Sequence, residues 1–392
     1  MSGLRASHLL EAIEAQSDAH PELLRMSTQL INVLAQGEID CSLAPWICGN
    51  RLIPLRKPDD GIRPIGVPEV WFRLVARCLV HKAKNRVKTY LGSIQLGVGV
   101  PTATESIIHK ISSIISVWDD DTPTRLLQLD VRNAFNSISR QSIWEQVHVV
   151  IPDLERWFLW AYGQPAPMFP DEAVDHVIWA TAGVIQGDPL GPLFFALGQQ
   201  KVLLQIQGLL PEFSIWYLDD GVLVASEAWL QSHWAQICEA YRMIGLEDPK
   251  KCLLFGGTAT CNTLNLPQHP LTAGIVLLGT PLGSASHIDA TLNNHYLRLE
   301  GLLRLLPNLR CKQVEFGILR YCLGPSKILH LLRTLAPAAL CAQVDQLLFC
   351  TLATLVGGPI PPAAWDLATL PVRRGGLGLV RAADIQAPAR LP

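Results

Sequence analysis

Two adjacent aspartates stand in an otherwise apolar segment, and their type and spacing suit them to chemistry. The segment "SIWYLDDGVLVAS" covers residues 214–226 and resembles a buried strand hairpin, with Asp219 and Asp220 at its centre. An ionised carboxylate in an apolar strand is costly unless its charge is compensated. Three arrangements would compensate it: an exposed turn, a nearby Arg or Lys, or a hard divalent cation that prefers carboxylate oxygens.

A third aspartate has the same character. Asp130 in "LLQLDVRNAF" ends a short apolar strand that is predicted over 126–131. Two adjacent strands that each end in Asp could bring their carboxylates to one pair of metal ions, which activates a 3′ hydroxyl and stabilises a leaving pyrophosphate. Phosphoryl transfer also requires basic groups at the triphosphate, and Lys57 and Arg63 in "RKPDDGIRP" are the candidates.

The elements that must position these residues follow from hydrophobic periodicity and turn signals. The chain begins with helices up to about residue 45, the second ending at Gly37, and the pieces on either side of "KPDDG" form a hairpin with an Asp-Gly turn. A basic helix over 69–91, a helix N-capped by Ser139, a long apolar helix after "GVIQGDPLGP" and a helix ending near Gly245 follow. Short strands are predicted in "KKCLLFGG" and "GIVLLGTPLG", and helices from about residue 288. This order predicts an α+β core with an antiparallel sheet, followed by a helical domain.

Composition limits the class of protein. The chain has 392 residues, 49% of them hydrophobic and 17% charged, which indicates a globular protein of two or three subdomains. The net charge of −2 argues weakly against a nucleic-acid partner, but basic residues are clustered: ten Lys or Arg against three acids over 51–88, and seven against two over 298–333. Two basic regions around an acid-rich centre suit a polyanion held from both sides, although ordinary solvated helix faces would give the same pattern.

Several classes of site and location are disfavoured. The ten cysteines contain no CxxC pair and no zinc-type spacing, so they are expected to be reduced and buried as small apolar residues. The start lacks a signal peptide, and the longest apolar stretches are interrupted by Asp, Gln or Pro. We therefore expect no membrane span, no membrane partner and no secretion, but an intracellular protein of the nucleus or cytoplasm. The tryptophans at 157, 160, 179, 229 and 234 are expected to pack in the core.

The order of these segments resembles the reverse transcriptases of non-LTR retrotransposons and, more distantly, of group II introns. "QLDVRNAFNSI" resembles the first palm motif, "GVIQGDPLGPLFFAL" the Gln-Gly-Asp-Pro-Leu motif, and "WYLDDGVLVA" the aromatic-x-Asp-Asp motif. "GLEDPKKCLLFG" resembles the Lys-Cys segment, "LLGTPLG" the primer-gripping turn, and "LIPLRKPDDGIRPIGVP" the fingers motifs. The resemblance covers about residues 45 to 380 and implies a right-hand polymerase.

The resemblance implies roles for individual residues. Asp130 and Asp219 match the metal ligands, with Asp220 near the metals and the Val131 carbonyl as a backbone ligand. The cofactors would be two Mg²⁺ or Mn²⁺ ions. The nucleotide would be contacted by Lys57 and Arg63 at the triphosphate, by Phe135 at the sugar and by Gln186 and Gly187 at the nascent pair. Lys251 matches the lysine that protonates pyrophosphate, although Lys250 is adjacent. Phe135 has packing of its helix as an alternative or additional role.

The implied fold has a fingers hairpin, a palm built on an antiparallel sheet with packed helices, and a helical thumb. The expected division is an N-terminal helical extension (1–44), fingers (45–115), the palm with the catalytic core (116–287), and a thumb with a truncated C-terminal segment (288–392). Leu218 departs from the family, where alanine is commoner at this position. The absence of nuclease, Cys/His-knuckle and RNase H signatures indicates a fragment or a decayed copy of an element.

Three hypotheses for the function remain. The first is an RNA-directed DNA polymerase that binds an RNA template, a DNA primer and deoxynucleoside triphosphates. The second is a catalytically inactive or fragmentary retroelement-derived protein that only binds nucleic acid. The third, an RNA-dependent RNA polymerase, shares the two-Asp palm, but Phe135 and the Gln-Gly-Asp-Pro-Leu motif favour deoxynucleotides. Host, element clade, template and oligomeric state are not indicated by the sequence.

Overall fold

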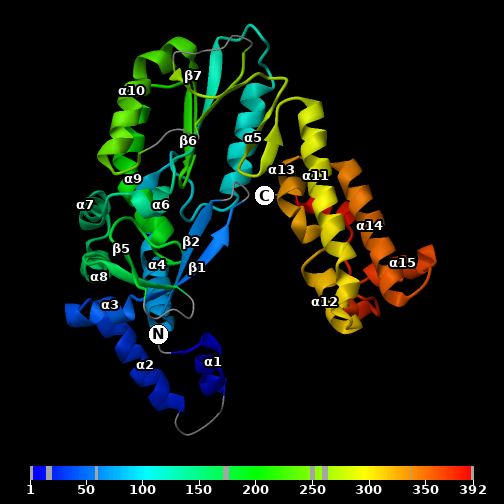
Figure 1. Ribbon diagram of the computed structural model, residues 1–392, viewed down its shortest axis with the longest axis horizontal. Coiled ribbons are helices and arrows are strands. Elements are labelled where there is room, and N and C mark those ends of the chain that lie inside the picture. Colours follow the sequence, from blue (N-terminus) through cyan, green and yellow to red (C-terminus); the bar gives the residue numbers. More distant parts are fainter. Residues whose placement is uncertain are drawn as a thin grey trace. The chain divides into compact units, whose positions relative to one another are not determined.

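The computed structural model describes residues 3–14, 20–57, 61–170, 176–247, 252–257, 264–335 and 337–389. It divides the chain into two compact units, and each is described by itself. Unit 1 comprises Met1–Pro101, Pro123–Leu254 and Thr260–Pro267, and unit 2 comprises Thr102–Thr122, Phe255–Ala259 and Gln268–Pro392. These units do not test the expected fingers, palm and thumb boundaries, which stay a prediction. The elements of both units are labelled in Figure 1.

A central sheet in unit 1 carries the aspartates. It contains β6 (Phe213–Tyr217), β7 (Asp220–Ser226), β3 (Thr124–Leu129) and β8 (Leu253–Phe255), in this order. β7 pairs antiparallel with both β6 and β3, with Tyr217 opposite Asp220 and Leu129 opposite Gly221. Because Asp130 directly follows Leu129, the end of β3 and the turn between β6 and β7 meet at one edge of the sheet. The predicted strands and their antiparallel pairing are confirmed.

The second sheet of unit 1 differs from the expectation. Its order is β2 (Ile62–Pro68), β1 (Asn50–Arg56), β4 (Ala166–Pro170) and β5 (Ile178–Ala180). β1 and β2 form the predicted antiparallel hairpin, but β1 also pairs in parallel with β4, so the sheet is mixed. The prediction of antiparallel pairing alone was therefore wrong for this sheet. β4 and β5 were not predicted, because they are short and the prolines of β4 disguise a strand pattern.

Helices surround these sheets and supply the core of unit 1. They are α1 (Ala6–Glu14), α2 (His20–Ala35), α3 (Ala44–Ile47), α4 (Val70–Leu91), α6 (Ala134–Ser137), α7 (Arg140–Val150), α8 (Glu155–Tyr162), α9 (Gly191–Gly208) and α10 (Glu227–Met243), with 3₁₀ turns η1 (Cys41–Leu43) and η2 (Pro152–Leu154). α9 is apolar on nearly all sides and buries Phe194 and Phe195 completely. Ser139 and Ser226 cap α7 and α10 through their side chains, as expected for Ser139. α10 lies beside β6 and β7 (Figure 1).

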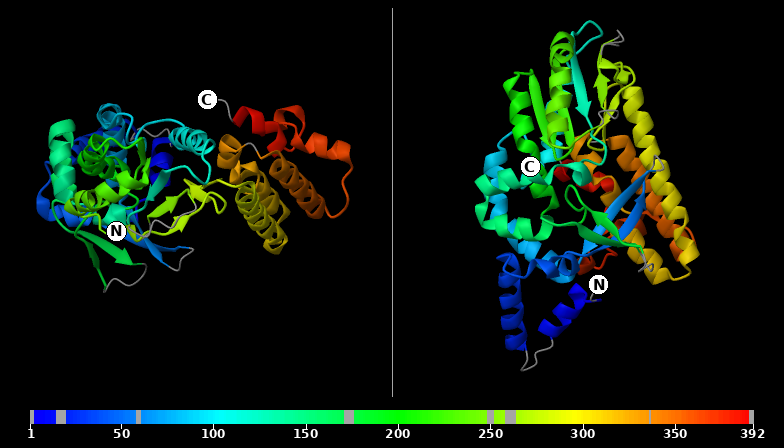
Figure 2. Two further views of the ribbon diagram at one scale, coloured as in Figure 1. Left: turned by 90° about the horizontal axis from the view of Figure 1, so that it is seen from above. Right: turned by 60° about the vertical axis from the view of Figure 1, so that its left-hand side comes forward.

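Unit 2 is mainly helical, with small strands. It contains α5 (Ala103–Ile115), β9 (Gln268–His269), β10 (Ile275–Leu277), β11 (Thr280–Leu282), α11 (Ala285–Arg304), α12 (Lys312–Tyr321), α13 (Leu329–Thr334), α14 (Ala338–Val356), α15 (Pro362–Thr369) and α16 (Ala382–Ala389), with η5 (Leu306–Leu309), η6 (Pro325–Lys327) and η7 (Val372–Arg374). Its own core includes Leu299, Leu319, Val344 and Leu348. The views in Figure 2 show α11 running beside α14. The predicted helical C-terminal region is confirmed.

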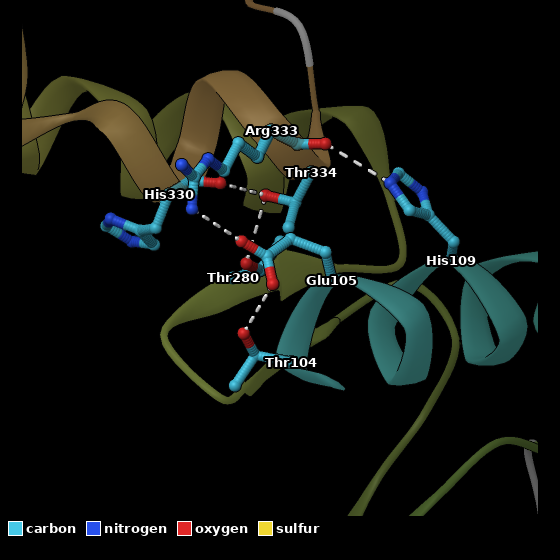
Figure 3. Close-up of polar contacts among 7 residues, drawn as sticks. All are labelled: Thr104, Glu105, His109, Thr280, His330, Arg333 and Thr334. Atoms are coloured by element: carbon cyan, nitrogen blue, oxygen red, sulfur yellow. Dashed lines mark hydrogen bonds and ion pairs between the residues drawn. The ribbon is translucent and has the colours of Figure 1, made fainter. Parts of the chain in front are cut away.

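A set of polar contacts joins α5 to α13 and β11 within unit 2, and we call it the α5–α13 joint (Figure 3). Arg333 donates to Glu105 at 3.1 Å, and Nε2 of His109 lies 3.2 Å from the Arg333 carbonyl oxygen. Beneath this pair, the buried hydroxyls of Thr280 and Thr334 are 3.1 Å apart, and Thr334 also donates to the His330 carbonyl. Three separate segments of unit 2 are fixed together at this point.

Helix α14 contradicts one expectation. It has 19 residues and a mean hydropathy of 1.6, and within the described part of the chain it is the one helix long and apolar enough to cross a membrane by length and composition. The prediction that no segment would meet this criterion was wrong, because one aspartate and two glutamines lower the average too little. A core helix meets the same criterion, and Val344, Leu348 and Leu352 of α14 lie in the core of unit 2. The nine cysteines that the structure describes are all free. The prediction that the cysteines are buried was wrong for five of them, because Cys41, Cys78, Cys311, Cys322 and Cys350 are exposed.

Candidate active site

A cavity of about 910 Å³ in unit 1 gathers the predicted site residues. It is lined by Lys57, Arg63, Ile65, Asp130, Val131, Asn133, Ala134, Phe135, Ile185, Gln186, Gly187, Asp188, Pro192, Asp219 and Asp220. These residues come from the β1–β2 hairpin, the end of β3, the start of α6, the segment before α9 and the β6–β7 turn. Every predicted site residue that the structure describes therefore lines one cavity. Lys251 lies outside the described residues, so its predicted role stays a prediction.

The three candidate carboxylates lie at the edge of the central sheet. Asp130 follows the last residue of β3, Asp219 lies in the two-residue turn between β6 and β7, and Asp220 begins β7. Each of these residues is partly buried. The strand ends bring the carboxylates together because Leu129, which precedes Asp130, is opposite Gly221, which follows Asp220. The three residues therefore meet at the same end of the sheet, while the predicted convergence of their carboxylates on one pair of metal ions stays a prediction.

Burial and mutual repulsion act on these carboxylates in the same direction. Burial, the largest cause, raises the pKa of Asp220 to about 7, and the negative charges of Asp219 and Asp130 add to the shift. Burial also raises the pKa of Asp219, with a further contribution from Asp130, while the cations Arg63 and Lys57 act against it. The surrounding protein therefore supplies less positive charge than these carboxylates need to ionise normally.

The donor set suits a hard divalent cation. Carboxylate oxygens and backbone carbonyls are the ligands that Mg²⁺ prefers, and a cation would relieve the repulsion that raises the two pKa values. As the side chains stand, no group of three His, Cys, Asp or Glu residues in the described ranges has the spacing of metal ligands. The three aspartates therefore suit Mg²⁺ by their chemical type and charge, but their side chains are not arranged as a set of metal ligands.

The two candidate cations lie on the β1–β2 hairpin. Arg63 is on β2 opposite Leu55, and the backbone N–H of Lys57 donates to the Gly61 carbonyl at 2.7 Å. Their charges reach the aspartates, since both act to lower the pKa of Asp219. Residues 58–60 lie outside the described ranges, so the predicted Asp-Gly turn between the strands is untested.

Gln186 and Gly187 lie against β2. The N–H of Gly66 donates to the Gln186 carbonyl at 2.8 Å. Gly187 has a φ of 130°, and a Cβ there would lie 2.0 Å from the Gly66 oxygen. Only glycine fits this approach, which fixes the segment before α9 to the strand that carries Arg63.

Phe135 packs against α9 and also lines the cavity, while its role at the nucleotide sugar stays a prediction. Its ring stacks on Phe195 of α9, with centroids 4.5 Å apart and planes at 8°. The side chain is nevertheless only half-buried and lines the cavity. It therefore packs against α9 and still presents part of its ring to whatever occupies the cavity.

Asp188 is a cavity residue to which the sequence reasoning gave no role. It is buried, accepts a 2.5 Å hydrogen bond from the Tyr162 hydroxyl and a 2.9 Å bond from the Leu190 N–H, and burial raises its pKa to about 6. The sequence signal that could have identified Asp188 was its position inside the motif "QGDPLGP".

The expectation that Trp179 packs in the core was wrong: it is 53% exposed on the short strand β5, whereas Trp157 and Trp160 are buried.

Comparisons with known proteins identify a matching protein family and a relative among curated proteins. Residues 55–264 match the family described as "Reverse transcriptase (RNA-dependent DNA polymerase)". The chain is 26% identical over 379 residues to the "Retrotransposable element SLACS 132 kDa protein" of Trypanosoma brucei gambiense, a match covering 93% of this chain and 31% of that protein. The chain thus spans about a third of the length of this curated relative.

Solved structures show a likeness in fold. An apo telomerase from Candida tropicalis superposes with a TM-score of 0.50 at 10% identity, covering 89% of this chain and 66% of that one. A telomerase from Candida albicans, in complex with a TWJ fragment of telomeric RNA, gives a TM-score of 0.48 at 11% identity, covering 87% and 60%. At such identities the likeness of the first structure bears on the fold alone.

Proposed function

The chain belongs to the reverse transcriptase (RNA-dependent DNA polymerase) family, and on this premise we propose that it extends a DNA 3′ end on an RNA template. The predicted membership is confirmed, and the relation to a retrotransposable-element protein supports an origin in a non-LTR retroelement. One observation carries the proposal: Asp130, Asp219 and Asp220 share a single cavity with the cations Lys57 and Arg63.

The chain's own residues divide the work of nucleotidyl transfer. Lys57 and Arg63 bind the triphosphate and neutralise its charge, because phosphoryl transfer depends mainly on positioning and electrostatic stabilisation. Gln186 and Gly187 line the nascent base pair, and Phe135 contacts the sugar where a 2′ hydroxyl would lie. In this proposal Lys251 gives a proton to the leaving pyrophosphate.

Asp130, Asp219, Asp220 and the Val131 carbonyl are the residues that would hold Mg²⁺ or Mn²⁺. When bound, two such ions supply Lewis-acid activation of the 3′ hydroxyl and charge neutralisation at the leaving group. The raised pKa values of Asp219 and Asp220 support this assignment, since the positive charge that the protein supplies does not offset their burial and mutual repulsion.

A basic pocket in unit 2 supports binding of the template–primer backbone. His295, Arg298 and Lys327 line a cavity of about 270 Å³ together with Leu299, Leu302 and Ile328. Among the residues that the structure describes, no salt bridge occupies Arg298 or Lys327. Lys and Arg side chains that neutralise phosphates dominate nucleic-acid affinity, so we propose that this pocket contacts the polynucleotide backbone.

A retroelement-derived protein that binds nucleic acid without catalysis is the second candidate. The observation that favours it is the ligand spacing, which the three aspartates lack within the described residues. Primer extension with Mg²⁺ separates the two candidates, because both would bind template and primer but only the polymerase would lengthen the primer.

The test of the proposed function is Asp219→Asn. Primer extension on an RNA template should fall by at least about 10³-fold, since the substitution removes a charged group that acts in the transition state. The thermal midpoint should not fall, because an amide is less costly to bury than a repelled carboxylate. The control is Asp121→Asn on an exposed loop outside the cavity. Extension by Asp219→Asn at the level of that control would refute the assignment.

A further inference from the structure

A glutamine outside the cavity makes contacts that bear directly on the aspartate turn. Gln95 has an exposed fraction of 0%. Its Nε2 donates to the Leu218 carbonyl and to Oε1 of Gln199, each at 3.0 Å, and its Oε1 accepts from the N–H of Leu218 at 2.8 Å and of Gly97 at 3.0 Å. A primary amide has two N–H donors and two acceptor sites. The side chain therefore uses its whole hydrogen-bonding capacity, and half of it on one residue.

That residue has an unfavourable backbone conformation. Leu218 has a φ of 55°, in the left-handed region that residues with a Cβ rarely adopt. It directly precedes Asp219 in the turn between β6 and β7. Such a conformation persists only where the surroundings determine it, and the Gln95 amide satisfies both polar backbone groups of Leu218 at once. These two hydrogen bonds from the Gln95 side chain to the Leu218 backbone, which we call the clamp, hold the turn in the shape that sets the direction of the two carboxylates.

The segment around Gln95 is itself fixed to the sheet. The Leu96 N–H donates to the Trp216 carbonyl at 2.8 Å, and the Trp216 N–H donates to the Ile94 carbonyl at 2.7 Å. Gly97 approaches the turn so closely that a Cβ there would lie 2.6 Å from Cγ and 2.7 Å from the backbone N of Leu218. The amide therefore acts from a rigid support rather than from a mobile loop.

The other side-chain partner of Gln95 lies on helix α9. Gln199 is a buried residue of α9, the helix that follows the Gln186–Gly187 segment. It also hydrogen bonds the Tyr241 hydroxyl, which accepts the indole N–H of Trp216 at 2.9 Å. Through one amide, the aspartate turn is tied to the helix that follows the segment proposed to line the nascent pair.

We propose that Gln95 is a positioning residue for the polymerase reaction, which fixes Asp219 and Asp220 through the backbone of Leu218 and in register with α9. The proposal rests on the proposed function and deepens it. A neutral amide suits the task, because a cation here would pair with the nearby carboxylates and a carboxylate would add to their repulsion and could not donate. Leu218, unusual for the family, contributes to the clamp through its backbone.

The test compares Gln95→Met with Gln200→Met in the full chain. Methionine keeps the length and flexibility of glutamine and removes the hydrogen bonds. Gln200 is a matched control, since it is buried on α9 and donates at 3.3 Å to the Leu91 carbonyl, away from the turn. The measurements are kcat and KM for deoxynucleotide in primer extension, Mn²⁺ affinity from water proton relaxation without substrate, and the thermal midpoint.

For Gln95→Met we expect kcat to fall by about 10²-fold, the usual scale for misplacement of a reacting group by about 1 Å, with a nearly unchanged KM. Mn²⁺ affinity should fall by about 10-fold, as when outer-shell support of a ligand is removed. Gln200→Met should stay within about twofold of the unmodified chain in both. Values of kcat and Mn²⁺ affinity for Gln95→Met that equal those of Gln200→Met would overturn the proposal.

Two further outcomes are informative. If the unmodified chain binds Mn²⁺ but extends no primer, the proposed function fails, while weaker Mn²⁺ binding by Gln95→Met still supports the positioning role. If the unmodified chain binds no Mn²⁺, the positioning role fails as well. Should Gln95→Met not fold, Gly97→Ala displaces the same turn with the amide intact and should lower kcat and Mn²⁺ affinity together; unchanged values would overturn the proposal.

Discussion

The carboxylates of the unit 1 cavity and the carboxylate of the α5–α13 joint in unit 2 experience opposite environments. Burial raises the pKa of Asp188 to about 6 and of Asp220 to about 7. Burial also acts to raise the pKa of Glu105, but hydrogen bonds from Thr104 and Arg333 and the charge of Arg333 outweigh it, and the pKa is lowered. In the joint, hydrogen bonds and the charge of Arg333 outweigh the effect of burial, whereas in the cavity the charges of Lys57 and Arg63 do not outweigh it at Asp219.

This difference separates a binding site from structural support. A carboxylate with a lowered pKa is already satisfied by the fold, so it stabilises the folded state and needs no other partner. A buried carboxylate with a raised pKa destabilises the folded state until a cation or proton binds, and such groups concentrate at functional sites. The direction of the shift therefore distinguishes the two regions even though both bury acids beside hydroxyl groups.

The largest effect expected on the free energy of unfolding comes from the titration of Asp188. Its folded-state pKa of about 6 exceeds its ordinary value of 3.8, so the folded state retains a proton that the unfolded state loses between these values. Stability from this proton is complete below pH about 4 and lost as the pH rises through about 6. The free energy of unfolding of the unmodified chain, relative to Asp188→Asn, should fall by about 2–3 kcal/mol over this range.

Denaturant unfolding at a series of pH values, without divalent ions, measures this change. The slope with pH is compared rather than the absolute stability, because asparagine also alters the hydrogen bonds to Tyr162 and Leu190. A relative stability that rises with pH would mean that Asp188 resembles Glu105, and the contrast between cavity and joint would not extend to this residue.

The sequence predicted the parts of the site that are anomalous locally. Asp130, Asp219 and Asp220 could be identified because each interrupts an apolar strand, and the antiparallel pairing of β6 with β7 follows from the two-residue turn between them. Gln95 could not be identified, since "SIQLGVG" contains nothing unusual and the amide acquires its role from Leu218, 123 residues further along the chain. The parallel pairing of β1 with β4 was missed for the same reason: it joins segments distant in sequence.

Within the joint, the two buried threonines should differ in their effects. Thr334 donates to the His330 carbonyl, so the Thr280 hydroxyl is the donor between the two threonines. Thr334→Val leaves the Thr280 hydroxyl buried without its acceptor and should cost about 2 kcal/mol, whereas Thr280→Val leaves Thr334 bonded and should cost about 1 kcal/mol. Denaturant unfolding of both variants measures the difference. Equal losses would mean that the Thr280 hydroxyl is not the donor in the contact between the two threonines that Figure 3 shows.

The smallest effect is expected for the ion pair of the joint. The side chain of Arg333 is 44% exposed, and exposed pairs contribute about 0.2–1 kcal/mol. Glu105→Gln should therefore lower the free energy of unfolding at pH 7 by about 0.5 kcal/mol. Because the pKa of Glu105 is lowered, this contribution is present above its ordinary value of 4.5 and is lost as the pH falls below it. It should also shrink at about 1 M salt.

A matched control is Glu300→Gln, which removes the partner of Arg304 from an exposed pair on α11 alone. Both variants should show similar small, salt-sensitive losses if the α5–α13 joint depends on its buried hydroxyls rather than on its charge. A loss above about 2 kcal/mol for Glu105→Gln that salt does not reduce would contradict this. Glu105 would then be a desolvated charge that depends on Arg333, and the joint would depend on this ion pair as well as on its buried hydroxyls.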